Sequence, residues 1–398
     1  MSNFDVIREA DQSFVAGTYG RFPVAIEKGK NATCYDFDGK EYIDFSSGIG
    51  VNSLGFCDEG WINAVTAQLN TLQHISNLYY TKPCIDAAGM LCERTGMKKV
   101  FFSNSGAEAN ECAIKAARKY AYLKDGCTDH EIIALDHSFH GRTMGALAVT
   151  GKKAYREAFE PLIGNVHFAN MNDFDSVLAQ VNDKTCAIIM ETVQGEGGIY
   201  PATEEFMQKV KALCEEKDIL LILDEIQCGM GRTGSMFAWQ KYGIKPDIMT
   251  TAKALGCGVP VGAFMMTEKV GQSSLVAGDH GTTYGGNPLA TAAINVVLDL
   301  FEENHIIDNV NSVGFYLEKK LDELVEKYDF IKTRRGVGFM QGLVFDKPVG
   351  PVISKALEKG LILINAGTDI IRFVPPLVIT KEHVDEMITI LTSCLNEG

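Results

Sequence analysis

Short apolar runs alternate with longer amphipathic stretches through the middle of this 398-residue chain. The runs at 131–135, 186–190, 219–223 and 248–251 are apolar at nearly every position, and polar residues follow each one. Strands without polar alternation are typical of a parallel sheet that is covered on both faces. The stretches at 107–123 and 204–218 have helical spacing. The region from about 60 to 295 therefore predicts a mostly parallel mixed sheet flanked by helices, an α/β fold.

The two ends of the chain have different patterns. Residues 34–45, "CYDFDGKEYIDF", are two alternating runs around Asp38-Gly39, which predicts a hairpin with a type I′ turn. The tail has a charged helical stretch (315–328), strand-like runs at 337–345, 360–365 and 369–377, and a closing helix with Thr380 as its N-cap. We expect a large domain over 51–297, a small α+β domain over 298–398, and a segment 1–50 that packs with the small domain.

Composition narrows the functional classes. Hydrophobic residues make up 46% and charged residues 22%, as in ordinary globular proteins. The net charge of −14 argues against nucleic acid as a partner. No apolar run approaches a membrane span, and the N-terminus lacks the apolar core of a signal peptide, so we expect a cytoplasmic protein. The eleven cysteines contain no C-x-x-C pair, which predicts free thiols and no metal site.

Ligands of parallel sheets bind beyond the carboxyl ends of the strands, so the residues that follow each run are the candidates. Ser105, Gly106 and Ala107 precede a helix, where free N–H groups hold a phosphate, although an ordinary N-cap has the same sequence. Phe139 and Arg142 follow the next run. They suit stacking on a ring and binding a carboxylate, with a plain surface loop as the alternative.

Three later strand ends carry ionisable residues. Glu191 and Glu196 flank a glycine-rich loop and suit acid–base work, or are simply solvated. Asp224 and Glu225 end an apolar run, where a partly desolvated carboxylate needs a cationic partner. A helix N-cap or a structural ion pair is the alternative. Lys253 lies among small apolar residues, which predicts a lowered pKa suited to a Schiff-base nucleophile rather than a surface lysine.

The segment 229–234, "GMGRTG", matches the dinucleotide fingerprint G-x-G-x-x-G. The fingerprint needs its first glycine directly after a strand and a helix opening from its last. Here "DEIQC" separates the run from Gly229, and Gly243 and Pro246 interrupt the stretch in which the helix would lie. The context therefore disfavours a dehydrogenase.

A carboxylate, a lysine, a phosphate cradle and an aromatic residue at one sheet edge together indicate a pyridoxal 5′-phosphate (PLP) site. The chain resembles the class III PLP-dependent aminotransferases of the ornithine/acetylornithine type, which have the fold type I architecture. The resemblance rests on "SGAEANE", "FHGRT", "VQGEGG", "LDEIQCGMGRTG", "TTAKALG", "HGTTYGGNPLA" and "RFVPPL", in that order, and on the 29 residues between Asp224 and Lys253 (253 − 224).

The resemblance implies roles around the cofactor. Lys253 would form the Schiff base with PLP and move the proton during catalysis, and Asp224 would pair with the ring nitrogen. Gln227 would contact the ring oxygen, and Phe139 would stack on the ring. The helix start at 105–107 would hold the phosphate. Thr283 would reach the phosphate of a neighbouring subunit, which implies a homodimer with shared sites.

The resemblance also implies substrate contacts. Arg142 would hold the substrate carboxylate and Thr282 would lie near it. Glu196 and Arg372 would form a gate that closes for the amine and opens for the 2-oxo acid.

"YGRFPVA" and "RFVPPL" are most similar to acetylornithine aminotransferases of arginine biosynthesis, which pass an amino group from N2-acetyl-L-ornithine to 2-oxoglutarate. Other class III ω-aminotransferases, acting on ornithine, succinylornithine, succinyldiaminopimelate or 4-aminobutyrate, are the alternatives. A non-catalytic cofactor-binding regulator would need a DNA-reading module that this chain lacks. Phe56 and Thr192 depart from the family pattern, which has histidine and proline there.

Overall fold

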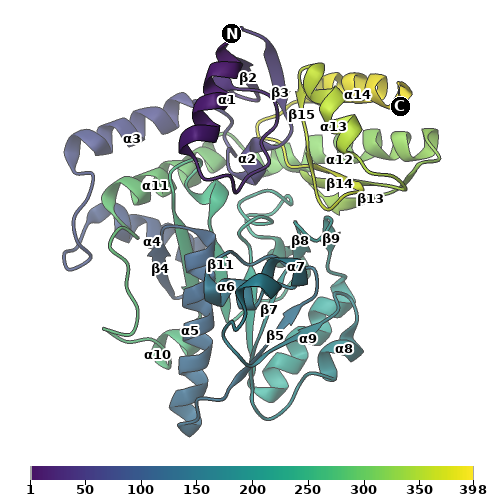
Figure 1. Cartoon of the computed structure of the whole chain (residues 1–398). Coiled ribbons are helices and arrows are strands. Elements are labelled where there is room, and N and C mark those ends of the chain that lie inside the picture. Colours follow the sequence, from purple (N-terminus) through teal and green to yellow (C-terminus); the bar gives the residue numbers. More distant parts are fainter. Residues whose placement is uncertain (1, 398) are drawn as a thin grey trace.

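A seven-stranded sheet forms the centre of the larger part of the molecule (Figure 1). The computed structural model describes residues 2–397. The strand order is β4 (Lys99–Ser103), β12 (Gly262–Met266), β11 (Ile248–Thr251), β10 (Leu220–Asp224), β7 (Thr185–Glu191), β5 (Glu131–Leu135) and β6 (Val166–Ala169). Only β12 runs antiparallel to its neighbours in this sheet. The prediction of a mostly parallel mixed sheet is therefore confirmed.

Alternate residues of each central strand enter two different hydrophobic cores. In β10, Leu221 and Leu223 belong to one cluster, whereas Leu220 and Ile222 belong to the other. Helix α5 (Gly106–Asp125) covers the second face, and α9 (Glu204–Lys217) covers the first. This arrangement explains why the strands show no polar alternation.

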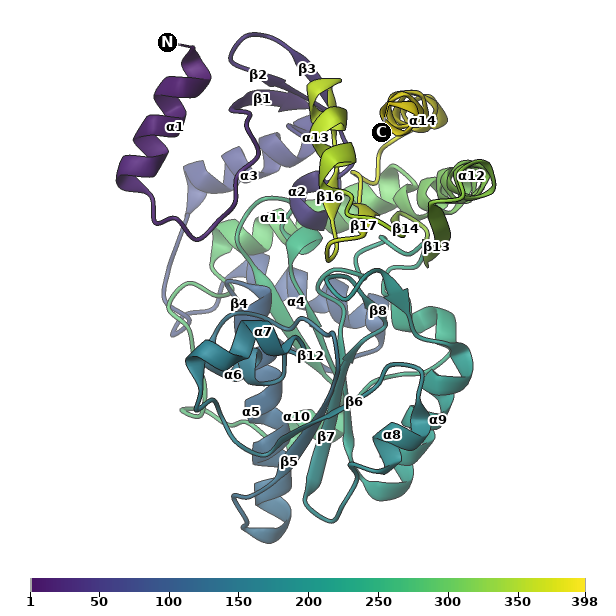
Figure 2. The same cartoon turned by 45° about the vertical axis from the view of Figure 1, so that its right-hand side comes forward.

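Further helices complete the larger part (Figure 2). They are α3 (Glu59–Thr71), α4 (Lys82–Thr95), α6 (Met144–Ala148), α7 (Lys153–Arg156), α8 (Phe174–Leu178), α10 (Glu268–Gln272) and α11 (Pro288–Glu303), with the 3₁₀ turns η1 (Glu157–Phe159), η2 (Ala238–Tyr242) and η3 (Lys253–Leu255). A two-stranded ribbon, β8 (Val193–Gln194) and β9 (Tyr200–Pro201), lies at the carboxyl end of β7.

Two smaller sheets are built from the ends of the chain, and both termini lie at the upper side of Figure 1. One contains β1 (Ile26–Lys30), β2 (Thr33–Asp36), β3 (Glu41–Asp44) and β15 (Leu361–Ile362). The other contains β13 (Ile331–Val337), β14 (Met340–Phe345), β17 (Ile370–Phe373) and β16 (Ile364–Asn365). The helices here are α1 (Asn3–Phe14), α2 (Ser47–Gly50), α12 (Ile306–Lys327), α13 (Gly350–Glu358) and α14 (Lys381–Asn396). Because β15 pairs with β3, the N-terminal segment and the tail share a sheet.

The structure corrects three local predictions. The hairpin after β2 forms, but its loop spans 37–40 with a positive φ at Gly39 and not at Asp38, so it is not the type I′ turn. The Asp36 carboxylate stabilises this loop by accepting the N–H groups of Asp38 and Lys40. Residues 361–365 form two strands in different sheets, and residues 337–345 begin at the turn between β13 and β14 rather than forming one strand.

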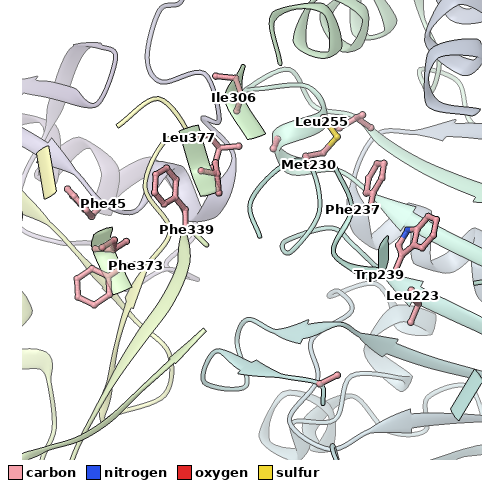
Figure 3. Close-up of a cluster of buried hydrophobic side chains, with 14 of the residues drawn as sticks. Phe45, Leu223, Met230, Phe237, Trp239, Leu255, Ile306, Phe339, Phe373 and Leu377 are labelled. Carbon is pink, nitrogen blue, oxygen red and sulfur yellow. The ribbon is translucent and has the colours of Figure 1, made fainter. Parts of the chain in front are cut away.

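One hydrophobic cluster connects the central sheet with the smaller sheets (Figure 3). Leu223 and Phe237 of the larger part share it with Phe45, Phe339 and Phe373 of the two ends. Burying such side chains contributes roughly 1.5–3 kcal/mol each, so this cluster stabilises the position of the tail above the sheet. No helix within residues 2–397 is both long and apolar enough to cross a membrane.

Candidate active site

A cavity of about 380 Å³ lies at the carboxyl ends of the central strands. Nine of the twelve predicted site residues line it: Ser105, Gly106, Ala107, Phe139, Arg142, Glu196, Asp224, Gln227 and Lys253. Residues that are 148 positions apart in the chain, Ser105 and Lys253, therefore meet because parallel strands present their ends at one edge.

Asp224 ends β10 as a buried carboxylate with a fixed orientation. Its Oδ2 lies 2.7 Å from His140 Nδ1 and 2.8 Å from the Asn110 amide nitrogen, and its Oδ1 accepts the Ile226 N–H at 3.0 Å. A carboxylate beside these donors accepts, so the Nδ1 atom of His140 carries the proton. The Asn110 amide oxygen in turn accepts from the Thr250 hydroxyl at 2.8 Å. Asp224 is thus held by its neighbours, with one edge toward the cavity.

Lys253 follows β11 in the turn η3, with a left-handed φ of 49°. The pKa of its amine is lowered to about 8, first by burial and then by the positive charge of Arg372. The carboxylates of Glu196 and Asp224 act in the opposite direction. The predicted lowering of the pKa is confirmed, and its largest cause is the predicted one, removal from water.

Arg372, in β17 of the tail, does not line the cavity itself but contacts two residues that do, Glu196 and Gln227. Its guanidinium forms an ion pair with Glu196 and donates to the Gln227 amide oxygen at 3.3 Å. Burial raises the pKa of Glu196, but the charge and hydrogen bond of Arg372 outweigh it, so the pKa is lowered overall. The Nε atom of Arg372 is buried and has no partner in the described part of the chain. The two hydrogen bonds of Arg372 both come from Nη1, so the Nε–H donor stays unused.

A model of the aminotransferase class-III family matches residues 14–395. The chain belongs to the class-III aminotransferases. It is 47% identical to the acetylornithine aminotransferase of Clostridium acetobutylicum, over 95% of this chain and 98% of that relative. It is also 47% identical to the acetylornithine aminotransferase of Methanocaldococcus jannaschii, over 95% of both chains.

Solved structures support the same assignment and the fold type I architecture. The ornithine aminotransferase from Toxoplasma gondii matches with a TM-score of 0.96 at 31% identity, covering 100% of this chain and 96% of that one. The N-acetylornithine aminotransferase from Stenotrophomonas maltophilia matches with a TM-score of 0.83 at 33% identity, covering 98% of both chains. The chain is therefore a PLP-dependent aminotransferase, as its sequence motifs predicted.

The cavity of this class-III aminotransferase fits PLP. Ser105 caps α5 by accepting the Glu108 N–H at 3.2 Å, which leaves the first N–H groups of the helix free for a phosphate. A Cβ atom at Gly106 would lie 2.7 Å from Ile226 Cδ1, so only glycine allows this close approach. Phe139 offers an aromatic wall, and Asp224 offers a carboxylate to a protonated ring nitrogen.

Glu191 is a site residue whose environment the sequence left open. It lies beside Asp224 in the sheet register and is only 5% exposed, so the solvated alternative is wrong. One carboxylate oxygen accepts the Phe139 N–H at 2.9 Å, and the other accepts the Gly195 N–H at 3.0 Å. Burial raises the pKa of Glu191 to about 7. Glu191 therefore ties the loop of the aromatic wall to the glycine-rich loop.

Glu225 has no role in the cavity. Its carboxylate accepts the N–H groups of Ala238 and Trp239 at 2.7 and 3.0 Å, and the Thr192 hydroxyl at 3.0 Å. Glu225 is thus a cap for η2, and the unusual Thr192 supplies one of its hydrogen bonds.

Thr282 and Thr283 do not line the cavity of their own chain. The Thr282 hydroxyl accepts from the Asn104 amide at 2.8 Å, and Thr283 is exposed on the same loop. Sequence reasoning missed His140 and Asn110 as partners of Asp224. The only signals for them were a histidine next to Phe139 and a polar residue one turn into α5.

Proposed function

We propose that this enzyme transfers the amino group of N2-acetyl-L-ornithine to 2-oxoglutarate, giving N-acetylglutamate 5-semialdehyde and L-glutamate. The observation that carries the proposal is the ion pair between buried Arg372 and Glu196, which lines the cavity. The amine-bearing carbon of acetylornithine has no carboxylate, whereas the carbonyl carbon of 2-oxoglutarate has one. While Arg372 is paired with Glu196, its charge is neutralised, which suits acetylornithine. When Arg372 is released from Glu196, its guanidinium can bind the carboxylate of 2-oxoglutarate.

The acetylated donor is favoured by the near full-length similarity to acetylornithine aminotransferases. Arg142, exposed at the cavity mouth, would bind the carboxylate at the far end of either substrate. Thr282 would lie near the substrate. Ornithine as donor is the second candidate, because an ornithine aminotransferase has the same fold at a TM-score of 0.96.

The remaining residues act on the proton and on the cofactor. When bound, PLP supplies an electron sink that acidifies the hydrogen on the amine-bearing carbon. Lys253 would provide the amine that binds the cofactor and then carries the proton between carbon atoms, since its pKa of about 8 leaves it able to accept and donate near neutral pH. Asp224 would keep the ring nitrogen protonated, Phe139 would stack on the ring, and Gln227 would contact the ring oxygen.

We also propose that two copies of the chain share their sites. The loop of Thr283 lies against the segment 74–80, where the Asn77 amide donates to the backbone oxygens of Thr282 and Gly285 at 3.2 and 2.8 Å. Leu78 and Tyr80 on this segment are 87% and 96% exposed. Apolar surface of this kind is typical of an interface. A second copy would cover it and bring Thr283 to the partner's phosphate. We propose as well that the large domain spans 51–297, that the small domain spans 298–398 with the segment 1–50 packed against it, and that the enzyme is cytoplasmic.

The test is a comparison of donors at fixed 2-oxoglutarate. N-acetylornithine is expected to give a kcat/KM at least tenfold above those of ornithine and 4-aminobutyrate, with glutamate formed one to one. Lys253→Ala serves as the inactive control. A higher kcat/KM for ornithine would replace the proposed donor by the second candidate, and turnover by Lys253→Ala would refute the role of the lysine.

A further inference from the structure

Arg142 has an unusual environment for an arginine at a binding site. Its side chain is exposed, and within residues 2–397 its guanidinium makes no hydrogen bond and no ion pair. Its contacts are instead with two aromatic rings. The central carbon of the guanidinium lies 3.9 Å from the centroid of the Tyr155 ring and 5.4 Å from that of Phe139. A cation at this distance from a ring face is attracted by the ring electrons.

Tyr155 belongs to α7, which packs beside the cavity, and its ring is fixed from two sides. It meets the Phe139 ring edge-on, with centroids 6.2 Å apart and planes at 88°. The Lys152 amine lies 4.7 Å from the centroid of the Tyr155 ring and 3.4 Å from its hydroxyl, so the contact with the ring does not depend on the hydroxyl. The backbone of Phe139 is in turn held by the buried Glu191 carboxylate. A continuous series of contacts therefore connects the end of β7 to the guanidinium of Arg142.

We propose that Tyr155 is a positioning residue that orients Arg142 for a substrate carboxylate. The inference rests on the proposed function, which assigns the carboxylate to Arg142. An acidic neighbour would also orient an arginine, but it would neutralise the charge and occupy the N–H groups. A ring face restricts the guanidinium and leaves all of its donors available for a bidentate contact. The aromatic ring of Tyr155, and not its hydroxyl, contacts Arg142. Tyr155→Phe is therefore expected to keep the function.

The first experiment compares Tyr155→Phe with Tyr155→Leu in the holoenzyme. Tyr155→Leu is expected to raise the KM for the amino donor and for 2-oxoglutarate about tenfold, with kcat within twofold, because both substrates use Arg142. Tyr155→Phe is expected to stay within twofold of the natural enzyme. Tyr122→Leu, which removes a half-exposed tyrosine of α5 outside the cavity, is the matched control and leaves both KM values unchanged.

A double-mutant cycle separates positioning from packing. In an Arg142→Ala background, Tyr155→Leu is expected to change KM less than twofold, since the group that it positions is gone. Glutarate, a dicarboxylate that cannot react, gives a readout without turnover, and its Kd in calorimetry is expected to follow the KM changes. If Tyr155→Leu does not fold, Tyr155→Met, which keeps most of the volume without a ring, takes its place.

The outcomes are distinct. If Arg142→Ala leaves both KM values unchanged, the carboxylate role in the proposed function fails, and the inference fails with it. If Arg142→Ala raises both values but Tyr155→Leu and Tyr155→Met do not, only the inference fails. An effect of Tyr155→Leu that persists in the Arg142→Ala background, or an equal loss in Tyr155→Phe, also overturns it.

Discussion

The amine of Lys253 is expected to be reactive at neutral pH even before the cofactor binds. Its pKa is lowered from the ordinary 10.5 to about 8. At pH 7 a group with a pKa of 8 is about 9% neutral, whereas one with a pKa of 10.5 is about 0.03% neutral. The neutral, nucleophilic fraction of Lys253 is therefore about 300 times larger than that of an ordinary lysine, since the two pKa values differ by about 2.5.

The assay is competitive labelling of the cofactor-free protein with an amine reagent from pH 6 to 11, quantified for the Lys253 peptide by mass spectrometry. Labelling of Lys253 is expected to rise with a midpoint near 8, and the exposed Lys28 is the internal comparison. Arg372→Met should move the Lys253 midpoint upward, because it removes a positive charge that lowers this pKa and frees the Glu196 carboxylate that raises it. A midpoint near 10.5, or a downward movement in Arg372→Met, would refute the reasoning.

Two substitutions test how buried polar groups hold the structure. Asp224→Asn places an amide where the natural carboxylate only accepts hydrogen bonds, so at least one of the donors His140, Asn110 and Ile226 loses its acceptor. We expect a loss of about 1–3 kcal/mol of stability and weaker PLP binding by fluorescence titration; unchanged binding contradicts the role of Asp224. Arg232→Met removes a guanidinium that is 1% exposed and donates to backbone oxygens of Phe339 and Pro375. The free energy of unfolding should fall by about 1–3 kcal/mol for each oxygen left unpaired, which lowers the urea midpoint, and an unchanged midpoint counts against this role.

The glycine-rich segment 229–234 illustrates what sequence context decides. Its sequence matches a dinucleotide fingerprint, but no strand end directly precedes it and no long helix is predicted after it. The structure agrees, since the next element is the short 3₁₀ turn η2. The segment instead supplies Arg232, whose side chain also lies 3.4 Å from the Ser47 hydroxyl. Its role is to join three parts of the chain, which no local pattern could indicate.

Periodicity predicted the central strands because their burial on both faces follows from local composition. It did not predict the break at Leu363, because residues 361–362 pair with β3 at the other end of the chain, whereas residues 364–365 pair with the nearby β17 in a different sheet. The lowered pKa of Lys253 followed from its apolar neighbours, whereas the contribution of Arg372 depends on a contact between two parts of the fold. The Arg372–Glu196 pair, 176 residues apart, was expected only through the resemblance to a family.

The central claim is that Lys253 carries the cofactor of this aminotransferase. The direct test is to reduce the holoenzyme with borohydride, which makes the linkage between PLP and its lysine permanent, and to locate the added group by peptide mass spectrometry. The account predicts one modified peptide, the one that contains Lys253, and none in Lys253→Ala. Modification of a different lysine, or an unmodified Lys253 peptide from enzyme that contains PLP, would contradict it.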